Sequence, residues 1–209
     1  MSGFISFSDS IKQFLTVIVP SPDLHAKWLN TLSYMENSGA RKIAACEHPT
    51  LVKEEVLKHA AEEFRHAHYL KKQIKRVISH TPDTYANPFI LGGTATLHYL
   101  SSLDLQTCRY LKSAGFNKSA IKEIAYLLVT YAIELRAEEM YPIYHEILKK
   151  YGSKVTIKSI LLEEKEHLRE MHEGINKLSS GFLHAKKICT LEGDLCKKWI
   201  LSINRSLLI

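Results

Sequence analysis

Two short stretches of the sequence repeat a pattern that could bind metal ions. Glu63 stands three residues before His66 in EEFRHAHYL, and Glu164 stands three residues before His167 in LEEKEHLRE. Residues three apart on a helix lie on the same face, so each carboxylate and its imidazole can serve one metal centre. Carboxylate together with imidazole suits iron, manganese or zinc. The repeated spacing therefore makes a metal site the first hypothesis for the chemistry of this chain.

The surrounding pattern supports this hypothesis more strongly than the motif does. A chain with 11 histidines contains about one Glu-x-x-His by chance. In four predicted helices, however, apolar residues recur at spacings of three and four, and carboxylates stand in the middle of that buried stripe. Isolated buried carboxylates cost several kcal/mol each, whereas two divalent ions would neutralise four of them. The candidate ligands on these stripes are Glu36, Glu63, His66, Glu134, Glu164 and His167.

Two positions near this set allow more than one interpretation. Glu138 follows Glu134 by one helical turn, so it is either the alternative ligand or an additional one. We favour Glu134, whereas the distance from Glu138 to Gly152 mirrors the first helical hairpin more closely. His59 precedes Glu63 by one turn on the same stripe, and we interpret it as a core histidine or as a partner of a ligand.

The elements that must position these residues are helices. We expect four long ones, at about residues 22–46, 50–79, 119–151 and 154–179. Short internal loops make each successive pair an antiparallel hairpin, and a connection of about 38 residues joins the two hairpins. That connection contains a helix at about 94–113. Further helices are expected at 8–19 and at about 182–206, within a single domain of residues 1–209 whose bundle core spans about 22–180.

The ligand pattern resembles that of the ferritin-like di-iron carboxylate proteins, the superfamily of rubrerythrins and di-iron oxygenases. The resemblance covers about residues 22–180 in the order and spacing of ligands, not in sequence detail. It implies an all-α, ferritin-like four-helix bundle of two antiparallel hairpins with a long crossover, plus N-terminal and C-terminal helices. It also implies that Glu63 and Glu164 bridge the two metal ions. His66 and His167 would each bind one ion, and Glu36 and Glu134 would be terminal ligands. In rubrerythrin-like proteins an additional Glu of the third helix is a ligand, which is the role that Glu138 could take.

The resemblance further implies O2 chemistry at two iron ions, with manganese or a mixed Mn/Fe pair as alternatives. The leading hypothesis is an oxidase or oxygenase that acts on a small organic substrate, with O2 and an external electron donor. One alternative is ferroxidase activity or iron and peroxide handling, and a second is a helical interaction protein without activity. The first hypothesis predicts an apolar pocket beside the metals, closed in part by the helix at 94–113 or the last helix. A second copy of the chain is a further candidate partner, in a homodimer.

Composition places the chain among soluble proteins. Charged residues make up 24% and the net charge is +6, while the four cysteines form no CxxC pair. Scattered thiols suit a reducing compartment, and no stretch approaches the roughly 20 apolar residues of a membrane span. We therefore expect a cytoplasmic protein without a membrane partner. The basic run KKQIKR, at Lys71 to Arg76, lies near a helix end, where cations complement the helix dipole, so a nucleic-acid partner is the less favoured interpretation.

Overall fold

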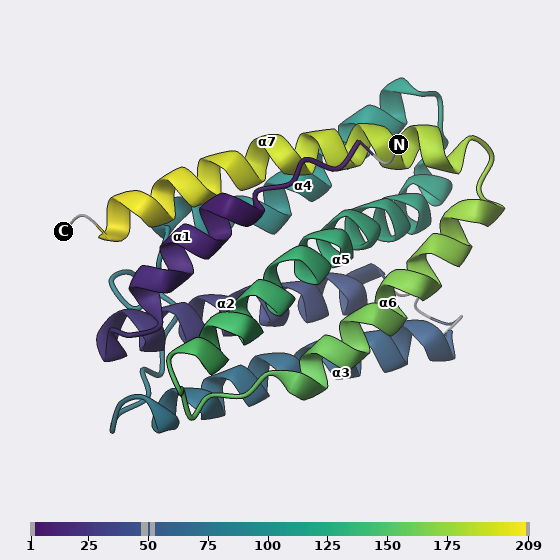
Figure 1. Cartoon of the computed structure of the whole chain (residues 1–209). Helices are drawn as coiled ribbons and strands as arrows, with labels where there is room; N and C mark the ends of the chain where they lie inside the picture. The colour runs from purple at the N-terminus through teal and green to yellow at the C-terminus, as the bar shows by residue number, and fades with distance from the viewer. Residues whose placement is uncertain (1–2, 47–49, 51–52, 208–209) are drawn as a thin grey trace.

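The chain folds into packed α-helices (Figure 1). The structure is a computed structural model that describes residues 3–46, 50 and 53–207, and within them it contains seven α-helices, one 3-10 helix and no strand. The helices are α1 (Ser8–Ile18), α2 (Pro22–Cys46), α3 (Glu54–Gln73), η1 (Ile74–Arg76), α4 (Gly93–Ser113), α5 (Lys118–Lys150), α6 (Lys158–Lys177) and α7 (Gly181–Leu207). The prediction of an all-helical protein is confirmed.

Two pairs of neighbouring helices form the part of the fold that matters for the site. Helix α2 packs on α3, and α5 packs on α6, as their short connections require. Helix α4 lies in the long connection between the pairs and packs on α5 and α7. Figure 1 shows α7 and α1 along one side of the molecule and α3 and α6 along the opposite side. The extra helices therefore cover α5 from the side that faces away from α3 and α6.

Two apolar clusters fill the interior, and both draw on α5 and α6. On α5, Ala132 belongs to one cluster and Ala137 to the other. On α6, Ile160 belongs to one cluster and Met171 to the other. The residues between these positions include the carboxylates and the histidine that the sequence places on the buried stripes. The polar site therefore lies between the two apolar clusters.

Aromatic packing fixes the covering helices to the body. Trp28 of α2 stacks on Trp199 of α7 with ring centroids 6.0 Å apart, and Phe14 of α1 meets Trp28 edge-on at 5.4 Å. All three side chains are buried, so they remove a large apolar area from water. These contacts hold α1 and α7 in place on the bundle.

Two helices, α3 and α6, are shorter than predicted, and α6 spans Lys158–Lys177 instead of about 154–179. Thr50 lies in a bend, and α3 begins only at Glu54, after Lys53 in extended backbone. At the other end, the α-helix stops at Gln73 and continues as the 3-10 turn η1, a common way for a helix to end. The predicted span of about 50–79 is therefore too long. None of the helices in the described part of the chain combines the length and the apolar character that a membrane span requires.

Candidate metal centre

Four helices bring seven potential ligands to one place in the interior. They are Glu36 from α2, His59, Glu63 and His66 from α3, Glu134 from α5, and Glu164 and His167 from α6. Glu36 is partly buried and the other six are buried. Each stands on the inward stripe of its helix, where positions three or four residues apart share one face. The apolar residues that precede and follow them on each stripe pack in the interior, and this packing places the polar cluster in the middle of the bundle.

The seven residues form two groups that share one carboxylate. The first group is His59, Glu63, Glu134 and His167, and the second is Glu36, Glu63, His66 and Glu164. Within each group, one ligand atom per residue lies within 4.8 Å of all the others. Bonds of about 2.1 Å to a common ion place its ligand atoms at most about 4.2 Å apart, so each group needs only a small contraction to bind one. Because Glu63 belongs to both groups, it is placed to bridge two ions.

The first group is compact and rich in nitrogen. Nε2 of His59 lies 3.3 Å from Oε1 of Glu63 and 3.4 Å from Oε1 of Glu134. Nδ1 of His167 lies 3.2 Å from the same Glu63 oxygen and 3.9 Å from the same Glu134 oxygen. Two imidazole nitrogens therefore face two carboxylate oxygens across a space the size of an ion.

The second group contains one imidazole and three carboxylates. Nδ1 of His66 lies 3.1 Å from Oε1 of Glu164 and 3.9 Å from Oε2 of Glu63. Glu36 completes this group, and the Tyr141 hydroxyl donates a hydrogen bond to its Oε1. This hydroxyl fixes the orientation of the Glu36 carboxylate. The two groups thus differ in donor set, with two nitrogens in the first and one in the second.

The atoms that face the centre lack hydrogen-bond partners. In the described part of the chain, eight buried side-chain nitrogen or oxygen atoms have no partner. Two belong to Trp28 and Thr81, and the other six belong to the ligand groups: His59 Nε2, Glu63 Oε1, His66 Nδ1, Glu134 Oε2, Glu164 Oε1 and His167 Nδ1. An unpaired buried polar atom ordinarily costs about 1–3 kcal/mol, and more if it is charged. Bound metal ions would supply the missing partners to all six.

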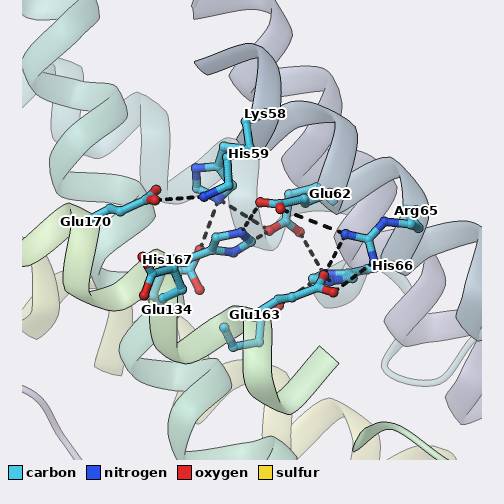
Figure 2. Close-up of polar contacts among 12 residues, drawn as sticks. Lys58, His59, Glu62, Arg65, His66, Glu134, Glu163, His167 and Glu170 are labelled. Atoms are coloured by element: carbon cyan, nitrogen blue, oxygen red, sulfur yellow. Dashed lines mark hydrogen bonds and ion pairs between the residues drawn. The ribbon is translucent and has the colours of Figure 1, made fainter. Parts of the chain in front are cut away.

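Each histidine is held by a group outside the cluster (Figure 2). Nε2 of His66 lies 2.6 Å from Oε2 of Glu163, and Nε2 of His167 lies 2.9 Å from Oε2 of Glu62. These carboxylates accept the Nε2 proton, which leaves Nδ1 as the free donor atom toward the centre. The arrangement is reciprocal, because the Glu that precedes each Glu-x-x-His orients the histidine of the other helix.

His59 is oriented in the opposite sense. Its Nδ1 lies 3.1 Å from the hydroxyl of Tyr126 on α5, so Nε2 is the nitrogen that faces the cluster. All three imidazoles therefore show the arrangement of metal-binding histidines, in which an outer partner fixes the ring and the tautomer.

Ion pairs between α3 and α6 close the outside of the site. Arg65 donates two parallel hydrogen bonds to Glu163, at 2.9 and 2.8 Å, and Lys58 pairs with Glu170 at 2.9 Å. Figure 2 shows Arg65 and Glu163 beside His66 and the Lys58–Glu170 pair beside His59. Both arginine and lysine side chains are about half exposed, so these pairs add little stability by themselves. Their effect is to fix Glu163 and to keep the two helices in register across the cluster.

Protons neutralise most of the carboxylates when no metal is bound. Burial, with repulsion from Glu63, raises the pKa of Glu134 to about 8. Burial also raises the pKa values of Glu36 and Glu164 well above the ordinary range, with neighbouring carboxylates adding to both shifts. Glu63 differs: burial opposes its ionisation, but its close contacts with His167, His59 and Glu36 lower its pKa well below the usual value. In the metal-free cluster, burial thus favours the neutral form of Glu36, Glu134 and Glu164, whereas the surroundings of Glu63 favour its charged form.

His167 carries the matching positive charge. Burial alone would lower its pKa, but the close contact with Glu63 and the nearby Glu134 and Glu164 raise it to about 10. In the metal-free protein a second imidazole proton would therefore lie on Nδ1 of His167, the atom that would bind a metal ion. Binding of metal must displace this proton and those of the neutral acids, so it releases protons and weakens at low pH.

A cavity of about 400 Å³ reaches the cluster from one side. It lies between α2, α4 and α5, and Glu36, Glu63, Glu134 and Glu164 line its inner end. The rest of its wall is mainly apolar. Pockets that bind organic molecules are of this size and have this kind of lining. The cavity lies beside the candidate metal centre and has the crossover helix α4 as one wall.

The structure brings the six ligand candidates together and adds a seventh. Glu138, the alternative on α5, is exposed and belongs to neither group, because the inward stripe after Glu134 continues through Ala137 and Tyr141. His59, interpreted from sequence as a core histidine or a ligand's partner, stands in the first group. Its spacing of four residues before Glu63 was the available signal. Its partner Tyr126 lies on another helix, where no local pattern reveals it.

Comparison of the chain with known protein families, with curated proteins and with solved structures found no match.

Proposed function

We propose that this protein is a ferritin-like di-metal carboxylate enzyme that binds two iron ions and uses O2 to oxidise a small organic substrate. Manganese or a mixed Mn/Fe pair is the alternative metal content. The observation that carries the proposal is the set of six unpaired buried atoms that face one another within the two groups. They are carboxylate oxygens and imidazole nitrogens, the donors that iron and manganese take in proteins.

The charge balance supports two ions rather than one. The four cluster carboxylates carry −4 when ionised, and two divalent ions carry +4. A single ion would leave an excess of negative charge in a buried site, where unpaired charge is costly. With two ions bound, Glu63 would contact both, and each remaining ligand would have an ion within reach.

A pair of reduced iron ions supplies, when bound, the electrons that reduce O2. For insertion of one oxygen atom the overall reaction is R–H + O2 + 2e⁻ + 2H⁺ → R–OH + H2O, and an external donor provides the two electrons. The protein positions the ions through Glu63 and the histidines, and it orients Glu36 through the Tyr141 hydroxyl. The apolar wall of the cavity keeps water away from the inner end, where the substrate would lie.

The cavity favours an organic substrate over Fe(II) as the substrate. Iron entry calls for a polar, acidic route, whereas this wall is mainly apolar. At its outer end, the charged residues of the lining are Arg41, Lys42 and a single acid, Asp104. These positive charges repel a free cation, so ferroxidase activity is the less favoured candidate.

Anaerobic reconstitution with Fe(II) tests the proposal. Elemental analysis should find about two iron ions per chain, and O2 consumption should follow exposure to air. Glu63→Ala should lose both ions because it removes the shared ligand, while Glu138→Ala, an exposed Glu of α5, is the matched control. Absence of bound metal in the reconstituted protein would overturn the proposal. Rapid, repeated Fe(II) oxidation with a mineral core would assign the site to iron handling instead.

A further inference from the structure

The cavity has two chemically different ends. Its inner end is formed by the carboxylates of the candidate metal centre. Among its lining residues, Arg41 and Ala45 of α2 and Ser101 of α4 are exposed, so the cavity opens to solvent between these two helices. A molecule that enters there reaches the metal centre with its leading end and leaves its trailing end between α2 and α4.

The wall between the two ends is suited to a hydrocarbon group. Its apolar residues come from all three helices: Leu32, Met35, Leu97, Leu100, Val129 and Ile133. Its tyrosines are already bonded, since the Tyr34 hydroxyl donates to the Leu97 carbonyl at 2.8 Å and the Tyr99 hydroxyl donates to Glu192. Among the described lining residues, buried side-chain atoms without a partner occur only on the cluster carboxylates. A polar substituent beside Tyr34 or Tyr99 would therefore meet hydroxyl groups that already donate to protein acceptors.

The outer end carries an excess of positive charge. Arg41 and Lys42 both line the cavity, and Lys42 pairs with Asp104 at 2.5 Å. Lys42 and Asp104 are each about 30% exposed, so the pair stands at the boundary with solvent. Arg41 and Lys42 carry two positive charges and Asp104 carries one negative charge, so one further negative charge from a ligand would balance this end of the cavity. Arginine and lysine donate charge-assisted hydrogen bonds to carboxylates and to phosphates, and a singly charged carboxylate matches this excess of one positive charge.

We propose that the cavity binds an amphipathic carboxylic acid, with its carboxylate at Arg41 and Lys42 and the far end of its apolar chain against the metal centre. This rests on the proposed function only for the fate of the molecule, which would be oxidised at the end remote from its carboxylate. Along α2, the five or six residues from Glu36 to Arg41 and Lys42 span about 8–9 Å at 1.5 Å per residue. A straight-chain acid such as octanoate covers a similar distance.

Gly39 opens the passage between the cavity and the carboxylates. A Cβ atom built at this position would lie 4.0 Å from Oε2 of Glu63, and no other atom would be as close. The side chain that is absent here would project into the space where the chain of the ligand meets the cluster. A larger residue would close that passage without meeting the backbone of another helix.

Binding to the metal-free protein tests the inference independently of O2 chemistry. Octanoate, octanol and octylamine share one apolar chain and differ in head-group charge. Titration calorimetry at equal pH should show octanoate binding at least about tenfold more tightly than the other two, equivalent to 1.4 kcal/mol. Arg41→Ala/Lys42→Ala should reduce octanoate to the affinity of octanol, while Lys27→Ala, on the same helix but outside the cavity, should not.

Substitution at Gly39 tests the position of the chain. Gly39→Leu should weaken all three ligands by tenfold or more, and Ala44→Leu, an exposed residue of α2 outside the cavity, should leave them unchanged. Circular dichroism of both variants verifies the fold. Equal affinity for the three ligands, or a preference for octylamine, would overturn the head-group assignment. Unchanged binding in Gly39→Leu would overturn the site. Iron content is measured separately, so failure of this inference leaves the proposed function standing.

Discussion

Helix α5 contributes to two buried charged clusters that differ in one respect. Glu134 belongs to the candidate metal centre, and Arg136, two residues later, belongs to a second cluster with Tyr99, Glu139 and Glu192, which we call the arginine cluster. Arg136 and Glu192 are 3% and 0% exposed, so their charges are as deeply buried as those of the metal ligands. The candidate metal centre has unpaired atoms, whereas the arginine cluster has none among its described members.

Protein groups alone satisfy the arginine cluster. Arg136 donates hydrogen bonds to both oxygens of Glu192 at 2.9 and 2.8 Å and a further one to Glu139. The Tyr99 hydroxyl also donates to Glu192, and the backbone N–H of Phe7 donates to Glu139 at 2.9 Å. Buried charge by itself is thus no sign of a metal site. The sign is buried donor atoms that face one another without partners.

The largest expected effect comes from breaking the arginine cluster. Arg136→Met leaves Glu192 buried without its cation, and we expect a loss of about 3–5 kcal/mol in the free energy of unfolding. In the metal-free protein, Glu134→Gln should instead raise this free energy near pH 7, because the unfolded chain ionises Glu134 at that pH whereas the folded chain holds it neutral, and glutamine is neutral in both states. Urea denaturation of both variants measures the difference.

The double variant Arg136→Met/Glu192→Leu sharpens this test. It removes both charges, so most of the lost stability should return. Equal losses in Arg136→Met and Glu134→Gln would contradict the distinction between the two clusters.

Metal should stabilise one cluster and leave the other unaffected. With Mn²⁺ at about 100 times its dissociation constant, the free energy of unfolding should rise by about 2.7 kcal/mol, since the ion binds the folded state. A chelator should reverse the rise, measured by thermal unfolding. Glu63→Ala should show no such rise. A similar rise in that variant would show that Mn²⁺ acts outside the two groups.

In the metal-free protein, the free energy of unfolding should depend on pH through the protonated groups of the candidate metal centre. The pKa of Glu134 is raised to about 8, so its stabilising contribution is complete below about 4.5, the value in the unfolded chain, and is lost as the pH rises through 8. The raised pKa of His167, about 10, acts in the same direction above pH 6.5. Between pH 6 and 8 stability should fall by about 1.4 kcal/mol per pH unit for each such proton. Denaturation curves across this range check the slope, which saturating Mn²⁺ should flatten or invert. A metal-free protein that gains stability over this range would contradict the protonation states described above.

The smallest effect should come from the outer partners of the histidines. Glu163→Gln weakens the acceptor for Nε2 of His66, and we expect about a tenfold lower affinity for Mn²⁺. Glu166→Gln, on the same helix and paired with Arg169, is the control. Calorimetric titration of both variants measures the affinities, and equal affinity in the two would remove Glu163 from the site.

Sequence periodicity predicted the helices and placed six candidate residues on helix faces that meet in the structure, for a local reason. The inward stripe of a helix depends on residues three or four apart, so Glu36, Glu63 and Glu164 could be placed on buried faces without knowledge of their neighbours. The same reasoning failed at Glu138, which is as close to the stripe as Glu134 in angle but is exposed. A small rotation of α5 decides between the two, and tertiary packing sets that rotation.

The outer groups depended on contacts between helices and could not be predicted. Glu62 and Glu163 stand beside ligands in charged runs that are typical of a solvated surface. Their role emerges only because α3 and α6 face each other, so that each carboxylate reaches the opposite histidine. Arg136 and Glu192 are 56 residues apart, and no spacing rule links them.

The position of Glu134 and Arg136 on α5 limits how this chain can change in length. Two residues of an α-helix separate their side chains by about 200°, so one cluster lies on each side of the helix. Insertion or deletion of one residue between them would turn one side chain by about 100° relative to the other. Helix α5 could then be rotated to restore either cluster, but not both. Length variation along α5 should therefore be confined to its ends, where loops can accommodate it. The number of residues in its central turns should stay fixed.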